Sequence, residues 1–103
     1  MNLIVTVGQV YTFKLTSGEE LIAKVIETQI DQQIVVQDPV SVAPGPQGLG
    51  LVPSMFTADL DTSIRINTNN VTLYALTEDG VKMKYIEATT GIKIPEKKLI
   101  IGS

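Results

Sequence analysis

The sequence predicts an all-β domain: a strongly bent, five-stranded antiparallel barrel followed by one short C-terminal helix. Aromatic residues make up only 5% of the chain, although 44% of it is hydrophobic. The core would therefore be built mainly from Val, Ile and Leu, a composition that favours strands. Short runs alternate between apolar and polar residues, and Gly, Pro or Asn interrupts them. At 103 residues, the chain is expected to form a single domain over residues 1–103.

The N-terminal part predicts a short strand over residues 3–7 and then a hairpin. Residues 11–15 alternate apolar and polar side chains, which is typical of a half-buried strand. Gly18 supplies the positive φ that a tight turn after this strand requires. The returning strand, residues 20–26, has Leu21, Ala23 and Val25 on one face and a mixed second face.

The middle of the chain predicts one long bent strand and one loop. Residues 34–36 form a continuous apolar run, typical of a strand that is covered on both faces. Pro39 interrupts the run and indicates an edge position or a bulge, so we interpret residues 34–42 as one strand bent at Pro39. Residues 43–53 are rich in Pro and Gly and predict a loop.

The C-terminal part predicts the remaining strands and the helix. Residues 54–60, 63–67 and 71–76 are compatible with strands, and the Asn-rich stretch before Val71 predicts a turn. Helical spacing of apolar residues indicates a helix over residues 80–90, with Asp79 as its N-cap. The apolar residues 99–101 would let the tail add to a sheet edge. We interpret the whole as a small barrel of the SH3-like and OB-like class.

The composition excludes several kinds of chemistry. The chain contains no Cys and no His, which removes disulfides, thiol nucleophiles, zinc sites built on these residues and imidazole catalysis. We expect no enzyme activity and no cofactor or metal. The N-terminal sequence is unlike a signal peptide, and no segment is long enough for a membrane span, so a cytoplasmic location is expected.

The net charge of −3 is unevenly distributed. Residues 1–64 carry two basic and seven acidic residues, a net charge of −5. Residues 65–103 carry six basic and four acidic residues, a net charge of +2. A general nucleic-acid coat is therefore not expected, whereas a local basic surface in the C-terminal part remains open.

Two stretches together resemble the Sm-like (LSm) family. LTSGEELIAKVIETQIDQQIVVQDP resembles the first Sm motif, with Gly18 at the turn glycine and Ile34-Val35-Val36 in the strand that follows the loop. IRINTNNVTLYAL resembles the second motif, starting at Ile64-Arg65. The blocks VAPGPQG and KYIEATTGIKIPEKK look similar to Sm-like proteins of tailed phages of marine cyanobacteria, which would place the protein in a host cytoplasm.

The resemblance implies a homo-oligomeric ring of about five to seven subunits that binds single-stranded RNA at its pore. The RNA-binding candidates that it implies are Gln29, Gln33, Arg65, Asn67, Asn69 and Asn70. Gln29 and Gln33 stand where the family has Asp and Asn, and the loop between them has no aromatic residue or His. Stacking of a base on an aromatic side chain contributes about 1–3 kcal/mol per base. The resemblance therefore supports the family's fold and its oligomeric ring more strongly than its RNA-binding pocket.

Each candidate also has a simpler interpretation. Arg65 would contact a base or a phosphate, or form an ion pair with Asp31 or Asp38 of a neighbouring subunit. Gln29 and Gln33 would read a base edge or simply lie in a solvated loop. The three asparagines would contact RNA or only permit the positive φ of a turn.

Two further stretches partly resemble ligand-binding loops but lack residues that those loops need at fixed positions. The glycines of residues 43–53 are not followed by the Lys-Ser/Thr of a phosphate-binding loop. Asp59 and Asp61 begin like a calcium loop, but Ile64 and Asn70 stand where an EF-hand needs Gly and Glu.

Three functional hypotheses remain open. The first is an RNA-binding ring that modulates RNA metabolism. The second is a structural or protein-interaction ring that contacts a partner through residues 43–53 or through the C-terminal tail. The third is a monomeric SH3-like adaptor.

Overall fold

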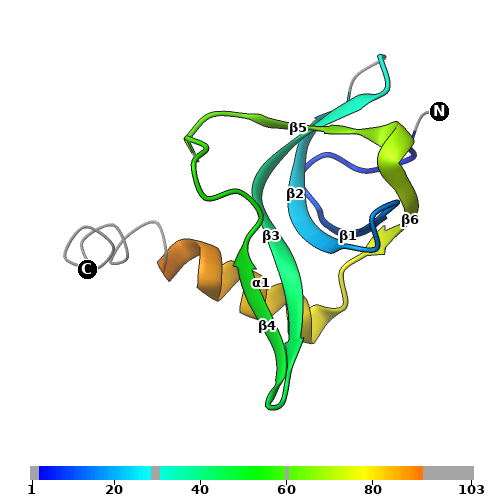
Figure 1. Cartoon of the computed structure of the whole chain (residues 1–103). Helices are drawn as coiled ribbons and strands as arrows, with labels where there is room; N and C mark the ends of the chain where they lie inside the picture. The colour runs from blue at the N-terminus through cyan, green and yellow to red at the C-terminus, as the bar shows by residue number, and fades with distance from the viewer. Residues whose placement is uncertain (1–2, 29–30, 60, 92–103) are drawn as a thin grey trace.

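A computed structural model describes residues 3–28, 31–59 and 61–91 (Figure 1). In these residues the chain forms six strands, one 3-10 turn and one helix. Their bounds are β1 (Val10–Leu15), β2 (Glu20–Thr28), β3 (Gln33–Gly45), β4 (Gly48–Pro53), β5 (Ile64–Asn67), η1 (Thr68–Asn70), β6 (Val71–Leu76) and α1 (Asp79–Gly91). The prediction of a β-rich domain with a C-terminal helix is confirmed.

The strands form one curved antiparallel sheet that stays open. Its order is β4-β3-β2-β1-β6, and β5 pairs with β3 beside β4. The expected closed, five-stranded barrel is therefore wrong for the described residues. A closed barrel would need the strands at the two outer edges of the sheet to pair with each other. Strands β5 and β6 follow one another through η1 but do not pair: β5 pairs with β3, and β6 pairs with β1.

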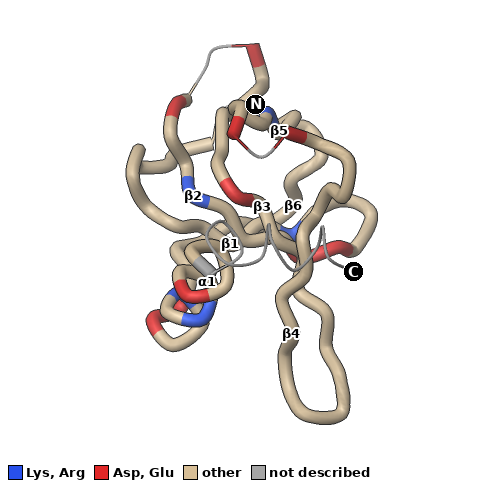
Figure 2. Tube along the Cα trace, turned by 90° about the vertical axis from the view of Figure 1, so that its left-hand side faces the viewer, with Lys and Arg blue, Asp and Glu red and all other residues tan. Residues whose placement is uncertain are grey.

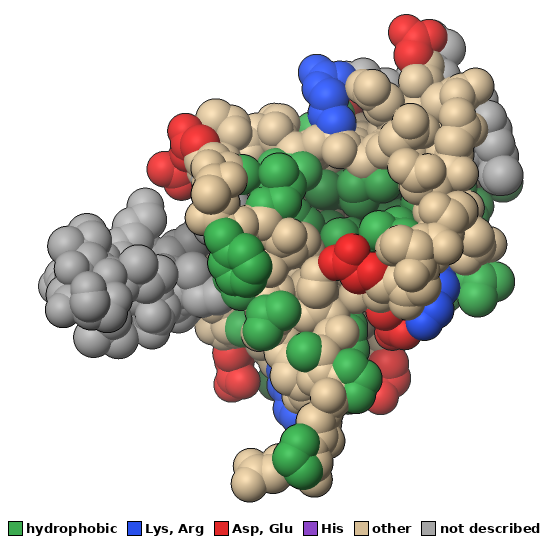
Figure 3. Space-filling model, in the orientation of Figure 1, with side chains coloured by type: hydrophobic (Ala, Val, Ile, Leu, Met, Phe, Trp, Pro, Cys, Tyr) green, Lys and Arg blue, Asp and Glu red, His purple; other side chains and the backbone are tan. Residues whose placement is uncertain are grey.

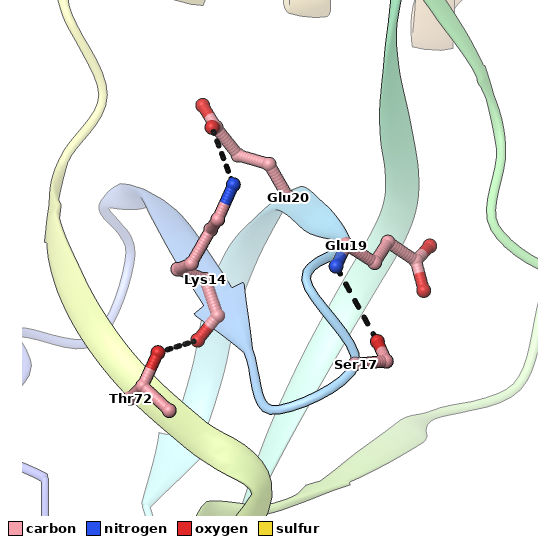
Figure 4. Close-up of polar contacts among 5 residues, drawn as sticks. All are labelled: Lys14, Ser17, Glu19, Glu20 and Thr72. Atoms are coloured by element: carbon pink, nitrogen blue, oxygen red, sulfur yellow. Dashed lines mark hydrogen bonds and ion pairs between the residues drawn. The ribbon is translucent and has the colours of Figure 1, made fainter.

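The first hairpin forms as predicted, and glycine is the reason. Gly18 has φ +92°, and its N–H donates to the Leu15 carbonyl at 2.9 Å. The Leu15 N–H donates in turn to the Glu19 carbonyl at 2.9 Å, which closes the hairpin. Figure 4 shows this turn, where the Lys14 ammonium lies 3.9 Å from the Glu20 carboxylate and the Glu19 N–H donates to the Ser17 hydroxyl.

Strand β3 is long and bent, as the sequence predicts. Ile22 of β2 pairs with Val40 and Lys24 pairs with Gln37, so β3 has an extra residue at this point. Asp38 takes φ +52° in the bulge, next to Pro39. On its other edge β3 pairs with β5 before the bulge and with β4 after it. The bend thus lets one strand belong to two parts of the sheet.

The loop predicted for residues 43–53 is in fact a β-hairpin. Ala43 pairs with Gly50 and Gly45 pairs with Gly48, which leaves a two-residue turn between the strands. Gly48 has φ +110°, a conformation that suits this turn. Beyond Ser41, β3 no longer pairs with β2, and prolines are tolerated on such an edge. This hairpin projects from the rest of the sheet (Figure 1), and we call residues 43–53 the arm.

Two expected strands are absent from the described residues. Residues 3–7 form no strand. Two of their N–H groups donate to tyrosine hydroxyls rather than to the backbone of a neighbouring strand: Ile4 donates to Tyr74, and Thr6 donates to Tyr11. Residues 54–59 also form no strand. The Thr62 N–H donates to the Asp59 carbonyl at 3.1 Å, so the chain turns there before β5 begins. Leu60 lies outside the described residues.

The core lies on both faces of the sheet. The concave face buries the larger cluster, which includes Phe13, Val25 and Val36, all 0% exposed. On the other face, Tyr85 of α1 packs with Ile22, which is 1% exposed. The mixed second face of β2 is therefore covered at Ile22 by the helix of the same chain.

The helix matches its predicted range within one residue at each end. Tyr85 is buried, and Val81 and Ala88 are half-buried on the same side. The predicted N-cap is wrong: Asp79 lies within α1, and the Glu78 carboxylate accepts from the N–H groups of Gly80 and Val81. The expected strand addition by the tail concerns residues 92–103, which lie outside the described residues.

Candidate nucleic-acid interface

Three of the candidate residues meet at one end of the sheet. Gln33 pairs with Asn67 across the β3–β5 ladder, and Arg65 stands two residues before Asn67 on the same face. The Arg65 guanidinium donates to the Gln33 side-chain oxygen at 3.5 Å. Residues 32 positions apart in sequence thus present an amide and a guanidinium side by side.

The turn after β5 is bonded to the loop before β3. The Thr68 N–H donates to the Gln32 carbonyl at 2.7 Å, and the Asn69 side-chain amide donates to the Gln32 side-chain oxygen. Gln32 takes φ +61°, which turns its peptide toward η1. This bonding joins the second of the two Sm-like stretches to the loop of the first.

The asparagines have different surroundings. The Asn67 side-chain oxygen accepts from the Asn69 N–H at 3.0 Å and caps η1. The expected positive φ is wrong, since Asn67 has φ −76° and neither Asn69 nor Asn70 takes a positive φ. The Asn70 carbonyl accepts from the Thr16 N–H at 2.8 Å. Asn69 and Asn70 are exposed and can contact a ligand. Gln29 lies outside the described residues.

A cleft of about 250 Å³ opens beside this cluster, below β5. Figure 3 shows hydrophobic side chains gathered in the hollow at the centre of this face. Its apolar lining is Leu15, Leu21, Pro39, Met55, Ile64 and Ile66, and its polar lining is Glu19, Ser54, Arg65, Asn67 and Asn70. Because the sheet is open, part of its concave face is accessible from outside.

The sequence analysis did not find the polar chain at the rim of this cleft. The Ser41 hydroxyl donates to the Glu19 carboxylate and lies 3.0 Å from the Ser54 hydroxyl. No local pattern joins these three residues, because strand pairing between β2, β3 and β4 brings them together. The neighbouring Glu20 does not join this chain, since its carboxylate lies 3.9 Å from the Lys14 ammonium.

The electrostatics of the site come from few charges. Arg65 at one end and Glu19 at the other are the ionisable side chains lining the described cleft. Within residues 3–28, 31–59 and 61–91, no group of three or more acidic residues is placed to hold a metal ion. The arrangement can therefore offer hydrogen bonds and one cation to a polar or anionic ligand, with an apolar floor beside them.

Comparison with models of known protein families finds no match, and comparison with curated proteins finds no relative. In the part of the chain that the structure describes, no helix is long and apolar enough to span a membrane.

Proposed function

We propose that the protein is an Sm-like, ring-forming protein that binds single-stranded RNA through Gln33, Arg65 and the exposed asparagines. The observation that carries the proposal is the Gln33–Arg65 pair beside the η1 turn. An amide can hydrogen-bond a base edge, and a guanidinium can bind phosphate or stack on a base. Base edges, base faces and phosphates are all contacts that a single strand of RNA offers.

Unpaired strand edges support the ring. Monomeric proteins protect a free strand edge with charged residues or proline. Strand β6 (VTLYAL) carries neither. Leu73 and Leu76 of this strand are 68% and 61% exposed. Pairing of β6 with β5 of the next copy would cover the free edges of these two strands and, repeated around about five to seven copies, would close a ring.

RNA binding is tested by titrating labelled oligo(U) and oligo(A) at low salt, first with the wild-type protein. Arg65→Gln is expected to weaken binding about tenfold and to reduce its dependence on salt. Lys84→Gln is the matched control, because it removes the same charge from the exposed side of α1 and should leave affinity unchanged. The absence of measurable wild-type affinity for both oligonucleotides would reject RNA binding.

A structural ring is the second candidate. The site has no aromatic ring on η1 or on the described part of the β2–β3 loop, so base stacking there is missing. Figure 2 shows that the projecting arm carries no charged residue, which suits contact with a protein partner. A partner that co-purifies after nuclease treatment would favour this candidate. Native mass spectrometry that finds only the 11.1 kDa chain would instead favour a monomeric adaptor.

A further inference from the structure

The segment between β4 and β5 bears an exposed aromatic side chain. Phe56 is 83% exposed, and its neighbour Met55 is 45% exposed. The other phenylalanine of the chain, Phe13, is 0% exposed in the core. Leaving a side chain of this size in water forgoes much of the stabilisation that burial provides, so contact with a partner is favoured.

This segment interrupts the sheet edge. Pro53 pairs with Val40 and Ile64 pairs with Val36, so residues 54–63 span the place where β3 contributes only residues 37–39. Residues 54–59 therefore leave the line of the edge that β4 and β5 form (Figure 1). Phe56 therefore stands next to the edge that a second copy would cover in the ring.

The opposite edge of the same sheet offers an apolar acceptor. Strand β6 has six residues and β5 has four. If β6 of a second copy pairs antiparallel with β5 so that its Val71 lies opposite Asn67, its C-terminal end lies beside Ile64 and its last two residues extend past β5 toward the segment between β4 and β5. These residues are Ala75 and Leu76, and Leu76 is 61% exposed.

We propose that Phe56 of one copy packs against Leu76 of the next copy, so that the segment between β4 and β5 locks each subunit to its neighbour. This inference rests on the proposed ring and names the side chains that hold it. Both partners are apolar and exposed in the single chain, and they lie on opposite edges. The contact is head-to-tail, so each subunit donates one Phe56 and accepts another.

The test uses two variants that each remove one half of the contact. Phe56→Asp and Leu76→Asp are each expected to raise the concentration at which half of the protein is assembled by about 10- to 100-fold. Met83→Asp is the matched control, because Met83 is 66% exposed but lies on α1 rather than on β6 or in the segment between β4 and β5. Light scattering over a dilution series measures assembly, and circular dichroism confirms that each variant is folded. Leu76→Ser is the milder variant if the aspartate disrupts β6.

Mixing the two variants tests the direction of the contact. Phe56→Asp retains an intact Leu76, and Leu76→Asp retains an intact Phe56. A head-to-tail contact therefore predicts that the mixture forms a one-to-one pair that cannot grow. A mixture that stays monomeric would overturn the head-to-tail contact.

The other outcomes are distinguishable. If the wild type forms a ring and Phe56→Asp forms it equally well, the inference is overturned and the ring stands. If Phe56→Asp assembles normally but binds RNA more weakly, Phe56 is a nucleic-acid contact, which also overturns the inference. A wild type that stays a single chain at all concentrations rejects the ring and the contact together.

Discussion

The Tyr85 hydroxyl donates to the carbonyl oxygen of Asp38 at 2.9 Å and so ties helix α1 to the bend of β3. The Gln37 carbonyl oxygen lies 3.0 Å from the same hydroxyl. Asp38 takes φ +52° at the bulge. The helix thus donates a hydrogen bond to backbone oxygens at the bend of the strand.

Removing this hydroxyl should destabilise the protein. Tyr85 is 3% exposed, so Tyr85→Phe leaves carbonyl oxygens without their donor in a place that water reaches poorly. We expect the free energy of unfolding to fall by about 1–3 kcal/mol, measured by urea denaturation. Tyr74→Phe is the control: its hydroxyl only accepts from the exposed Ile4 N–H, and its loss should cost less than about 1 kcal/mol. Equal losses for both variants would contradict this account.

Alkaline pH should weaken the same contact. Burial, and then the negative charge of Asp38, raise the pKa of Tyr85 above its ordinary value near 10. The unfolded chain therefore releases this proton at a pH where the folded chain still holds it, so stability is fully present below about pH 10 and falls as the pH rises beyond it. Wild type should lose more stability than Tyr85→Phe between pH 8 and pH 11, as measured from urea midpoints. Parallel losses would show that Tyr85 does not contribute to the alkaline transition.

The turn between β1 and β2 should depend on glycine at one position. Gly18 has φ +92°, so Gly18→Ala should cost roughly 1–2 kcal/mol of unfolding free energy. Gly45→Ala serves as the comparison, because Gly45 has no positive φ and a Cβ there would lie 3.7 Å from the Gly48 carbonyl oxygen. That substitution should change stability by less than about 0.5 kcal/mol or improve it slightly. Thermal unfolding of the two variants in parallel measures the difference in stability. A Gly45→Ala variant that is as unstable as Gly18→Ala would contradict the prediction.

The start of α1 should depend on the Glu78 carboxylate. It accepts from the Val81 N–H at 3.2 Å and also from the Gly80 N–H. Glu78→Ala should therefore lower stability by about 0.5–2 kcal/mol and reduce the helical signal in circular dichroism. Glu87→Ala removes the same charge from an exposed position inside the helix, where alanine is well tolerated. If Glu87→Ala were the more damaging of the two, the cap would not stabilise the helix.

Local sequence patterns predicted much of the fold. Alternation predicted β1 and β2, a single glycine predicted their turn, and Pro39 predicted the bend of β3, because each depends on residues close together in sequence. The same locality explains the errors. The density of Pro and Gly in residues 43–53 predicted a loop, yet two strands pair there because β3 continues past the edge of the sheet.

The candidate site was only partly accessible to such reasoning. The likeness to the Sm motifs pointed to Gln33 and Arg65, and pairing of β3 with β5 places them together. Nothing local indicated that Asn69 would bond to Gln32, or that Ser41 would join Glu19 to Ser54. These contacts join residues from different strands or loops, so they exist only once the sheet has formed.

The sequence by itself determined that the chain is β-rich, ends in a helix, bends at Pro39 and lacks the side chains for thiol or imidazole chemistry. Only the tertiary structure decided that the sheet stays open, that α1 covers Ile22, and which edges remain unpaired. The physical reason is that alternation and turn residues act over a few positions, whereas strand partners are chosen among segments far apart in the chain.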